Sequence, residues 1–302
     1  MQDIISDFYK RFTHDGAIAE KVSCPASVCL FSGGRNFCPE VGLRLSFGAE
    51  AAYSKRKDGR IVLARSDSDT LQSTNVADYP KGSYADWAEE IISSILQLPI
   101  KQEGVQMLLH TDVGLPELAP RTLCAVFAAA KISGKAISAQ SVLRCANYSA
   151  YCLASLIPQH RVCIVNSQTL DYAQYNLETG GRKIIVVKTN ARRKNPNLSG
   201  RFSEREAERI GKAALCLADD YIKGLGELMC ESSRDMLKTF SDNKMEQLFE
   251  IILEFSRSVR ILPDYSGAVF FAENENVDNF IMLIGDKYEK KTGTRPAFYI
   301  SD

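Results

Sequence analysis

Segments of strand type and of helix type are mixed along this chain without strict alternation, and this order restricts its fold more than any other feature. Apolar runs typical of strands occupy residues 22–31, 43–54 and 183–189, while residues 87–98 carry apolar side chains at helical spacing. Strict alternation would predict a parallel sheet with helices on both faces, whereas mixed runs favour an α+β fold. Since 302 residues are enough for two lobes, we predict an α+β chain of two lobes.

The remaining segments follow the same two patterns. Asp58-Gly59 stands between two apolar runs, which is a hairpin signal, so we expect strands 43–54 and 61–64 to pair. Ser203 is expected to cap a long helix, with Glu206 at the capping-box position. Helices are predicted at residues 1–14, 121–131, 138–156, 203–222, 224–240, 243–259 and 276–292, and further strands at 105–110, 161–166, 266–272 and 297–300.

The charges of the chain balance, with 37 basic and 37 acidic residues. A neutral chain has no general attraction for nucleic acid or for an anionic membrane. The first residues mix polar and apolar side chains, unlike a signal peptide, and no apolar stretch reaches the roughly 20 residues of a membrane helix. We therefore expect a soluble, cytoplasmic protein that binds neither nucleic acids nor membranes.

The nine cysteines are scattered, and none belong to a Cys-x-x-Cys pair. Only three histidines are present, and they are far apart in the sequence. Structural zinc sites usually show closely spaced pairs of ligands, so we expect no metal site. An odd and scattered set of cysteines indicates reduced cytosolic thiols, several of them buried as small apolar side chains.

Six segments, in the same order and across nearly the whole chain, resemble motifs of the galactokinases, which belong to the GHMP family of small-molecule kinases. Residues 24–31 (CPASVCLF) resemble the family's A-P-G-R-V-N-L-I, and residues 226–234 (GELMCESSR) resemble its G-x-L-M-x-E-S. The other four segments are Phe8 with Phe12, residues 75–82 (NVADYPKG), residues 166–172 (NSQTLDY) and residues 288–299 (YEKKTGTRPAFY). Each similarity is modest alone, whereas six in register identify the chain as a galactokinase-like member of this family.

The resemblance implies the two-lobed GHMP kinase fold, with the active site in the cleft between the lobes. Residues 1–160 would form an N-terminal lobe like ribosomal protein S5, and residues 161–302 a ferredoxin-like C-terminal lobe. Galactokinases are transferases of carbohydrate metabolism, in which a glycine- and serine-rich loop binds the phosphates of Mg-ATP through backbone N–H groups.

The nucleotide-binding positions implied by the resemblance are altered in this chain. The phosphate loop corresponds to residues 112–121, which contain Gly114 as their one glycine, no serine and two prolines that lack an N–H. Glu117 adds a negative charge where phosphate would lie, and Arg121 could compensate, although an arginine at a helix start is more often solvated. A second glycine-rich motif of the family retains only Gly267. We expect this loop not to bind ATP.

The sugar-binding and catalytic positions are altered as well. Ser27 replaces the family's arginine beside the reaction centre, and Tyr151 replaces the aspartate that acts as the catalytic base. The positions of sugar-binding side chains are occupied by Gly33, Gly34, Asn36, Asn166 and Phe202. Because losing one hydrogen-bond partner of a sugar hydroxyl costs about 1–3 kcal/mol, we expect galactose affinity to be largely lost.

Four altered elements in one chain favour a pseudo-kinase, which acts as a scaffold or regulator through a protein partner. Its cleft would be empty or adapted to another small ligand, and no cofactor is expected. The alternative is an active ATP-dependent sugar-1-kinase that uses Mg-ATP and displaced groups such as Asp112, Asp171 and the basic residues 192–194. A third hypothesis, nucleic-acid binding through the same basic residues, conflicts with the neutral net charge.

Overall fold

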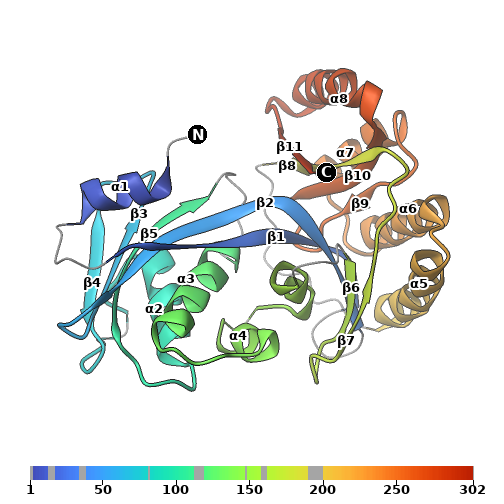
Figure 1. Ribbon diagram of the computed structural model, residues 1–302. Coiled ribbons are helices and arrows are strands. Elements are labelled where there is room, and N and C mark those ends of the chain that lie inside the picture. The colour runs from blue at the N-terminus through green and yellow to red at the C-terminus, as the bar shows by residue number, and fades with distance from the viewer. Residues whose placement is uncertain are drawn as a thin grey trace. The chain divides into compact units, whose positions relative to one another are not determined.

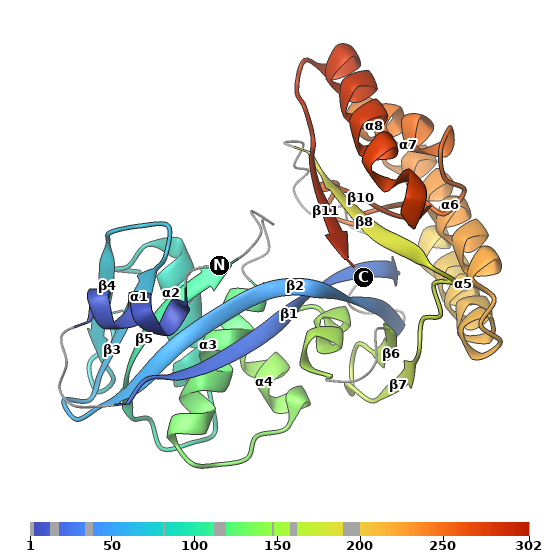
Figure 2. The ribbon, with the colours of Figure 1, turned by 45° about the horizontal axis from the view of Figure 1, so that its top comes forward.

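The computed structural model describes residues 3–12, 18–33, 39–80, 82–111, 119–146, 148–157, 162–189 and 200–301. The chain forms two compact units that interleave along the sequence. Unit 1 comprises Met1–Ala26 and Phe47–Tyr148, and unit 2 comprises Ser27–Ser46 and Ser149–Asp302. This grouping differs from a division after residue 160, because residues 27–46 and the described residues from 149 to 157 belong with the C-terminal part of the chain. Figures 1 and 2 show the ribbon from two directions.

Unit 1 contains a mixed sheet. Its strand order is β4-β3-β5-β2, with β1 paired to β2. Strands β1 and β2 also supply residues to unit 2. The strands are β1 (Glu20–Ser32), β2 (Pro39–Arg56), β3 (Arg60–Arg65), β4 (Leu71–Asn75) and β5 (Gly104–Thr111).

The hairpin predicted at Asp58-Gly59 is wrong. Strand β5 lies between β2 and β3, pairing antiparallel with the first and parallel with the second. Residues 104–109 of β5 are all buried. This strand pairs with the edges of β2 and β3 that would face each other in a hairpin. The turn at residues 57–59 therefore connects strands that are not neighbours.

The helices described in unit 1 are α1 (Ile4–Arg11), α2 (Asp86–Leu96), α3 (Ala119–Ile132) and α4 (Ala139–Ala146). Helix α1 lies on one face of the sheet, and α2 and α3 lie on the other (Figure 1). Side chains of α1 pack on strand residues two positions apart, such as Val62 and Ala64 of β3, because alternate residues of a strand face the same side of the sheet. The cluster beneath α1 consists of Ile4, Phe8, Phe12, Ala19, Ala52, Val62, Ala64 and Leu108.

Unit 2 contains the start of β2 paired with β6 (Val162–Asn166), which in turn pairs with β7 (Tyr172–Tyr175). It also contains a second, antiparallel sheet in the order β11-β8-β10-β9. The strands of this sheet are β8 (Arg182–Lys188), β9 (Arg260–Ile261), β10 (Gly267–Glu273) and β11 (Ala297–Ser301). The helices of unit 2 are η1 (Ala150–Leu156), α5 (Arg201–Ala218), α6 (Ile222–Thr239), α7 (Asn243–Leu253), η2 (Asn274–Asn276) and α8 (Val277–Thr292).

An apolar core of unit 2 joins alternate residues of β8 and β10 to helices α6, α7 and α8. Ile185, Val187, Ala268 and Phe270 supply the sheet side of this core, and Met236 belongs to its helical side. One face of the sheet is thus buried by helices. This is the arrangement expected for an α+β unit, and it confirms the predicted fold class.

Two predicted helices and one predicted cap differ from the structure. The helix expected at residues 138–156 is two separate pieces, α4 and the 3₁₀ helix η1, and the helix expected at 243–259 ends at Leu253. Gly200 occupies the N-cap of α5, so Ser203 and Glu206 are not a capping box. Both side chains are buried instead. Ser203 donates to the carbonyl of Gly33, and Glu206 accepts from Arg260.

Candidate functional site

A buried pair of hydroxyls fills the position that the resemblance assigns to a catalytic arginine. The Oγ of Ser155 in η1 donates to the Oγ of Ser27 in β1 at 2.9 Å. The exposed fractions are 2% for Ser27 and 5% for Ser155. Residues 26–32 of β1 are all buried, so the strand gives Ser27 no path to solvent. At this position the side chain of Ser27 therefore offers a neutral hydrogen bond in place of a positive charge.

The backbone of Tyr151, at the position of the catalytic base, is bound by a buried carboxylate. The N–H of Tyr151 donates to Oε2 of Glu40 at 2.9 Å, and the hydroxyl of Ser32 donates to Oε1 at 3.2 Å. Glu40 is only 2% exposed. A Cβ on Gly42 would overlap the carbonyl oxygen of Tyr151, so η1 packs directly on β2. Both elements thus fix the Tyr151 backbone.

Glu40 is the main residue of this region that the sequence analysis missed. An isolated glutamate beside the apolar residues 41–43 is the signal that could have marked it. Buried carboxylates need hydrogen-bond partners, and Glu40 finds two of them within unit 2. Its oxygens bind the fold together and do not face solvent.

The thiol of Cys29 lies close to the same carboxylate. Burial raises the pKa of Cys29 well above its usual value, and the charge of Glu40 raises this pKa further, while Arg260 acts in the opposite direction. A thiol held in its protonated form is a poor nucleophile. Cys29 therefore behaves as a small apolar side chain of the core.

Two predicted sugar-binding positions are occupied by the fold itself. Gly33 accepts a hydrogen bond at its carbonyl from the Oγ of Ser203, at 2.5 Å. The ring of Phe202 is 2% exposed and packs edge-on against Phe240, with 6.1 Å between centroids. Phe202 belongs to the apolar core and cannot reach a ligand in this structure. Gly34 and Asn36 lie outside the described residues.

Asn166, the fifth predicted sugar-binding position, shapes a turn. Its Oδ1 accepts hydrogen bonds from the backbone N–H groups of Gln168 at 2.9 Å and Thr169 at 3.1 Å. The turn continues through Leu170, whose φ of 63° is in the left-handed region. An asparagine that accepts from the next two or three N–H groups is a common turn device. Asn166 therefore closes the hairpin between β6 and β7.

Glu206 and Arg260 form a buried ion pair at the centre of a polar network. Arg260 Nη2 is 3.2 Å from Glu206 Oε1, and both side chains have no exposed surface. Ser232 donates to both oxygens of Glu206, at 2.8 and 2.7 Å, and Arg209 donates to Oε2 at 3.0 Å. Arg260 Nε also donates to the carbonyl of Leu30 at 2.5 Å, which ties the network to β1.

In unit 1, Arg121 is the predicted nucleotide-binding residue that the structure describes. It lies in the first turn of α3, where its Nε and Nη2 donate to Oγ1 of Thr111 at 3.1 and 3.0 Å. Burial lowers the pKa of Arg121, and the charge of Arg65 lowers this pKa further. Among the described residues no carboxylate forms an ion pair with Arg121. Gly114 and Glu117 lie outside the described residues.

The ends of the parallel strands β3 and β5 bring Arg121 close to a second arginine. Arg65 ends β3 and pairs with Leu109 of β5, so its side chain lies at the carboxyl edge that Thr111 also occupies. Arg65 bonds to Asp67, and its guanidinium lies 5.6 Å from the centroid of the Trp87 ring. Ligand crevices in open sheets form outside the carboxyl ends of strands. Asp67 neutralises Arg65 at this edge, so among the described residues Arg121 is the arginine there without an ion pair.

Gly267, the surviving glycine of the second nucleotide motif, is required by the sheet. It begins β10 opposite Lys188 of β8. A Cβ at this position would overlap the carbonyl oxygen of Val187. The close approach of two strands thus explains the glycine without a nucleotide.

No family model matches the chain. It is 22% identical over 197 residues to a galactokinase of Bacillus subtilis (strain 168), a match that covers 48% of this chain and 50% of the relative. The matched segment thus spans about half the length of that curated relative. Among solved structures, the galactokinase of Lactococcus lactis in complex with galactose aligns with a TM-score of 0.79, 13% identity and coverage of 99% of this chain and 96% of that one.

A mevalonate kinase structure aligns with a TM-score of 0.71 and 13% identity, covering 93% of this chain and 98% of that one. Galactokinase and mevalonate kinase share the GHMP fold. The chain is galactokinase-like and has the GHMP kinase fold. At these identities the structural likeness shows the fold, and it leaves substrate and activity to be argued from the residues.

The predicted site residues of the galactokinase-like protein that the structure describes fall in two places. Ser27, Tyr151, Gly33, Phe202, Asn166 and Gly267 belong to unit 2, and Arg121 belongs to unit 1. Tyr151 belongs to the short helix η1, and Ser27 accepts a hydrogen bond from Ser155 of the same helix. Asn166 lies in the β6–β7 turn. Within the described ranges no group of three or more His, Cys, Asp or Glu side chains could hold a metal ion. No helix in the part of the chain that the structure describes could cross a membrane.

Proposed function

We propose that this galactokinase-like protein does not transfer phosphoryl groups and acts instead as a scaffold or regulator through a protein partner. The hydroxyl pair of Ser27 and Ser155 carries the proposal. Phosphoryl transfer depends almost entirely on positioning and on charge stabilisation. A neutral, buried pair of hydroxyls in place of an arginine supplies no such charge.

The position of the base supports the same conclusion. A phenol is a weak base at neutral pH, since its usual pKa is about 10. Glu40 contacts the Tyr151 backbone and is the carboxylate that could replace the missing aspartate. It is buried, and each of its oxygens accepts a hydrogen bond from the fold. Both features favour a chain that lacks a base for a sugar hydroxyl.

The competing function is an active sugar-1-kinase that uses Mg-ATP and displaced groups. Of these groups, Asp171 is exposed at the β6–β7 turn, where its backbone N–H donates to Oγ1 of Thr169 and its carbonyl accepts from Asn166. Asp112 and residues 192–194 lie outside the described residues. The structure thus supplies no observation that favours this reading over the first.

The two functions are distinguished by measuring ATP consumption with a panel of sugars that includes galactose. We expect no sugar-dependent ADP release, and an active galactokinase assayed in parallel verifies the conditions. Thermal unfolding with Mg-ATP provides a second measurement. A bound nucleotide would raise the melting temperature, because a ligand at 100 times its Kd stabilises the folded protein by about 2.7 kcal/mol. Sugar-dependent ADP release would overturn the proposal in favour of the active kinase, and its loss in Asp171→Asn would assign a role to Asp171.

The regulatory half of the proposal is tested separately. A protein partner isolated with the tagged chain is produced recombinantly, and its Kd for the purified chain is measured by calorimetry. We expect saturable binding of the reconstituted pair. A chain that neither releases ADP nor binds any reconstituted partner contradicts the regulatory role.

A further inference from the structure

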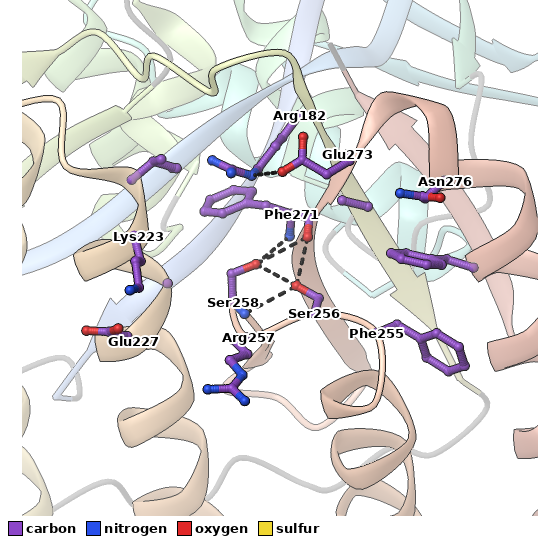
Figure 3. Close-up of a pocket in the computed structure, with 14 residues that line it drawn as sticks. Arg182, Lys223, Glu227, Phe255, Ser256, Arg257, Ser258, Phe271, Glu273 and Asn276 are labelled. Atoms are coloured by element: carbon purple, nitrogen blue, oxygen red, sulfur yellow. Dashed lines mark hydrogen bonds and ion pairs between the residues drawn. The ribbon is translucent and has the colours of Figure 1, made fainter.

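A pocket of about 430 Å³ opens in unit 2, away from every residue that the sequence analysis assigned to a site. It lies between the start of α6, the loop that follows α7, and the end of β10 (Figure 3). Binding pockets for small molecules usually measure about 300–1,000 Å³. The pocket is therefore large enough for a compact organic ligand.

The floor of this pocket is held in place by two serines of the loop after α7. Ser256 donates to the carbonyl of Phe271 at 2.8 Å, and the N–H of Phe271 donates to the hydroxyl of Ser258 at 3.0 Å. The two hydroxyls also bond to each other at 2.8 Å (Figure 3). A Cβ on Gly226 would come within 2.7 Å of the Cβ of Ser258, so α6 packs closely on this loop. The pocket is thus formed before any ligand binds.

Aromatic side chains form one part of the wall. Phe255 and Phe280 lie with ring centroids 5.3 Å apart and planes inclined at 49°. Phe271, Ala272 and Ile222 extend the apolar lining. Such a surface favours the flat face of an apolar ligand, because aromatic side chains bury large areas with little loss of conformational freedom.

Cations dominate the charged part of the wall. Arg182 and Glu273 neutralise each other, with 2.7 Å between Nε and Oε1. Lys223 and Arg257 are exposed and form no ion pair with a described residue, and Glu227 is the acid that remains. Figure 3 shows Lys223 and Glu227 on the same helix and Arg257 on the loop opposite. Two unpaired cations against one unpaired acid leave an excess of positive charge.

We propose that this pocket binds a small organic anion with a flat apolar body. The aromatic side chains would contact the body, and Arg257 and Lys223 would bind the anionic group. Guanidinium groups suit this task because their planar set of donors matches a carboxylate. The lining includes Gly226 and Glu227 of the galactokinase-like segment 226–234, but none of the residues assigned above to a nucleotide, sugar or catalytic position. A ligand here would therefore bind apart from those positions.

The experiment is calorimetric titration of the purified chain with 2-naphthoate, with 2-naphthamide and with acetate. The three probes separate the contribution of the charge from that of the ring. We expect saturable binding of one 2-naphthoate per chain, at least about fivefold weaker binding of the neutral amide, and no measurable binding of acetate. Absence of saturable 2-naphthoate binding, or equal binding of the acid and the amide, would overturn the proposal.

Variants place the binding in this pocket. The double variant Lys223→Glu with Arg257→Glu reverses two exposed charges and should weaken 2-naphthoate binding about tenfold. Lys212→Glu, an exposed charge on α5 outside the pocket, is the matched control and should bind as the wild type does. Equal affinities for the double variant and the control would show that 2-naphthoate binds elsewhere. Thermal unfolding of each variant confirms that it is folded.

Discussion

The guanidinium of Arg260 meets the carboxylate of Glu206 at 3.2 Å in a place where neither side chain touches solvent. The pair joins β9 to α5, and Arg260 also binds the carbonyl of Leu30 in β1. Buried pairs of this kind add little compared with an apolar replacement, yet breaking one leaves a charge without a partner. The stability of unit 2 should therefore be sensitive to either residue.

Replacing Glu206 with glutamine should destabilise the protein by about 3–5 kcal/mol, since Arg260 and Arg209 would then lack their shared carboxylate. Urea unfolding gives the free energy. Glu208→Gln, an exposed position on the same helix, is the matched control and should change stability by less than about 0.5 kcal/mol. A loss no greater than that of the control would show that the network does not stabilise unit 2.

Two glycine-to-alanine changes should have opposite signs. Gly267→Ala places a Cβ against the Val187 carbonyl and should cost at least about 2 kcal/mol, because two paired strands would have to move apart. Gly211 lies inside α5 with nothing near its missing Cβ, so Gly211→Ala should stabilise by about 0.5–1 kcal/mol. Thermal unfolding compares the two, and a neutral Gly267→Ala would reopen a ligand-related reason for this glycine.

Asn166 tests whether a sugar-binding position has become a turn residue. Asn166→Ala removes the acceptor for the N–H groups of Gln168 and Thr169 and should cost about 1 kcal/mol. Asn166→Asp keeps the acceptor and should retain stability close to that of the wild type. If the alanine variant unfolds at the same urea concentration as the wild type, the turn does not depend on this side chain.

Stability should fall in alkaline solution because of buried thiols. Burial raises the pKa of Cys163 to about 12 and that of Cys124 well above its usual value. The folded state keeps these protons after the unfolded thiols have lost theirs, so the thiols stabilise the protein fully below about pH 8.5 and progressively less above it. At pH 9.5 each fully protonated thiol should account for a loss of roughly 1.4 kcal/mol.

Urea unfolding at pH 7.5 and 9.5 measures this loss. Cys163→Ala removes one of the thiols, so the difference in unfolding free energy between the two pH values should shrink by roughly 1.4 kcal/mol. The same pH dependence in wild type and variant would mean that Cys163 ionises as easily in the folded state as in the unfolded state.

Segments with a clear apolar period were predictable, because the pattern is local. Strands β1, β8 and β10 and helices α2, α3 and α6 lie within a few residues of their predicted positions. Strands β4, β7 and β9 were not predicted: β4 has one buried residue, β7 has none, and β9 has only two residues. The place of β5 between β2 and β3 depends on pairing between distant segments, which no local pattern contains.

In the candidate site, too, the positions could be predicted from local sequence, whereas the contacts between remote residues could not. The resemblance to galactokinase placed Ser27, Tyr151 and Phe202 in the sequence, but their surroundings come from remote residues. Ser155, which bonds to Ser27, is 128 positions away. The spacing of Ser203 and Glu206 matches a capping box. In the structure, however, Ser203 donates to the carbonyl of Gly33, and Glu206 accepts from Ser232.

The interleaving of the two units has a consequence for synthesis of the protein. Residues 27–46 leave the ribosome long before β6 and Arg260, which bind β2 and β1 within unit 2. Unit 2 therefore cannot complete its fold until nearly the whole chain has been synthesised. Until then the apolar residues of β1 and β2 in this segment lack the residues that they pair with in the folded protein. Such exposed strands invite association between chains, so translation speed and chaperone access should govern how much folded protein a cell obtains.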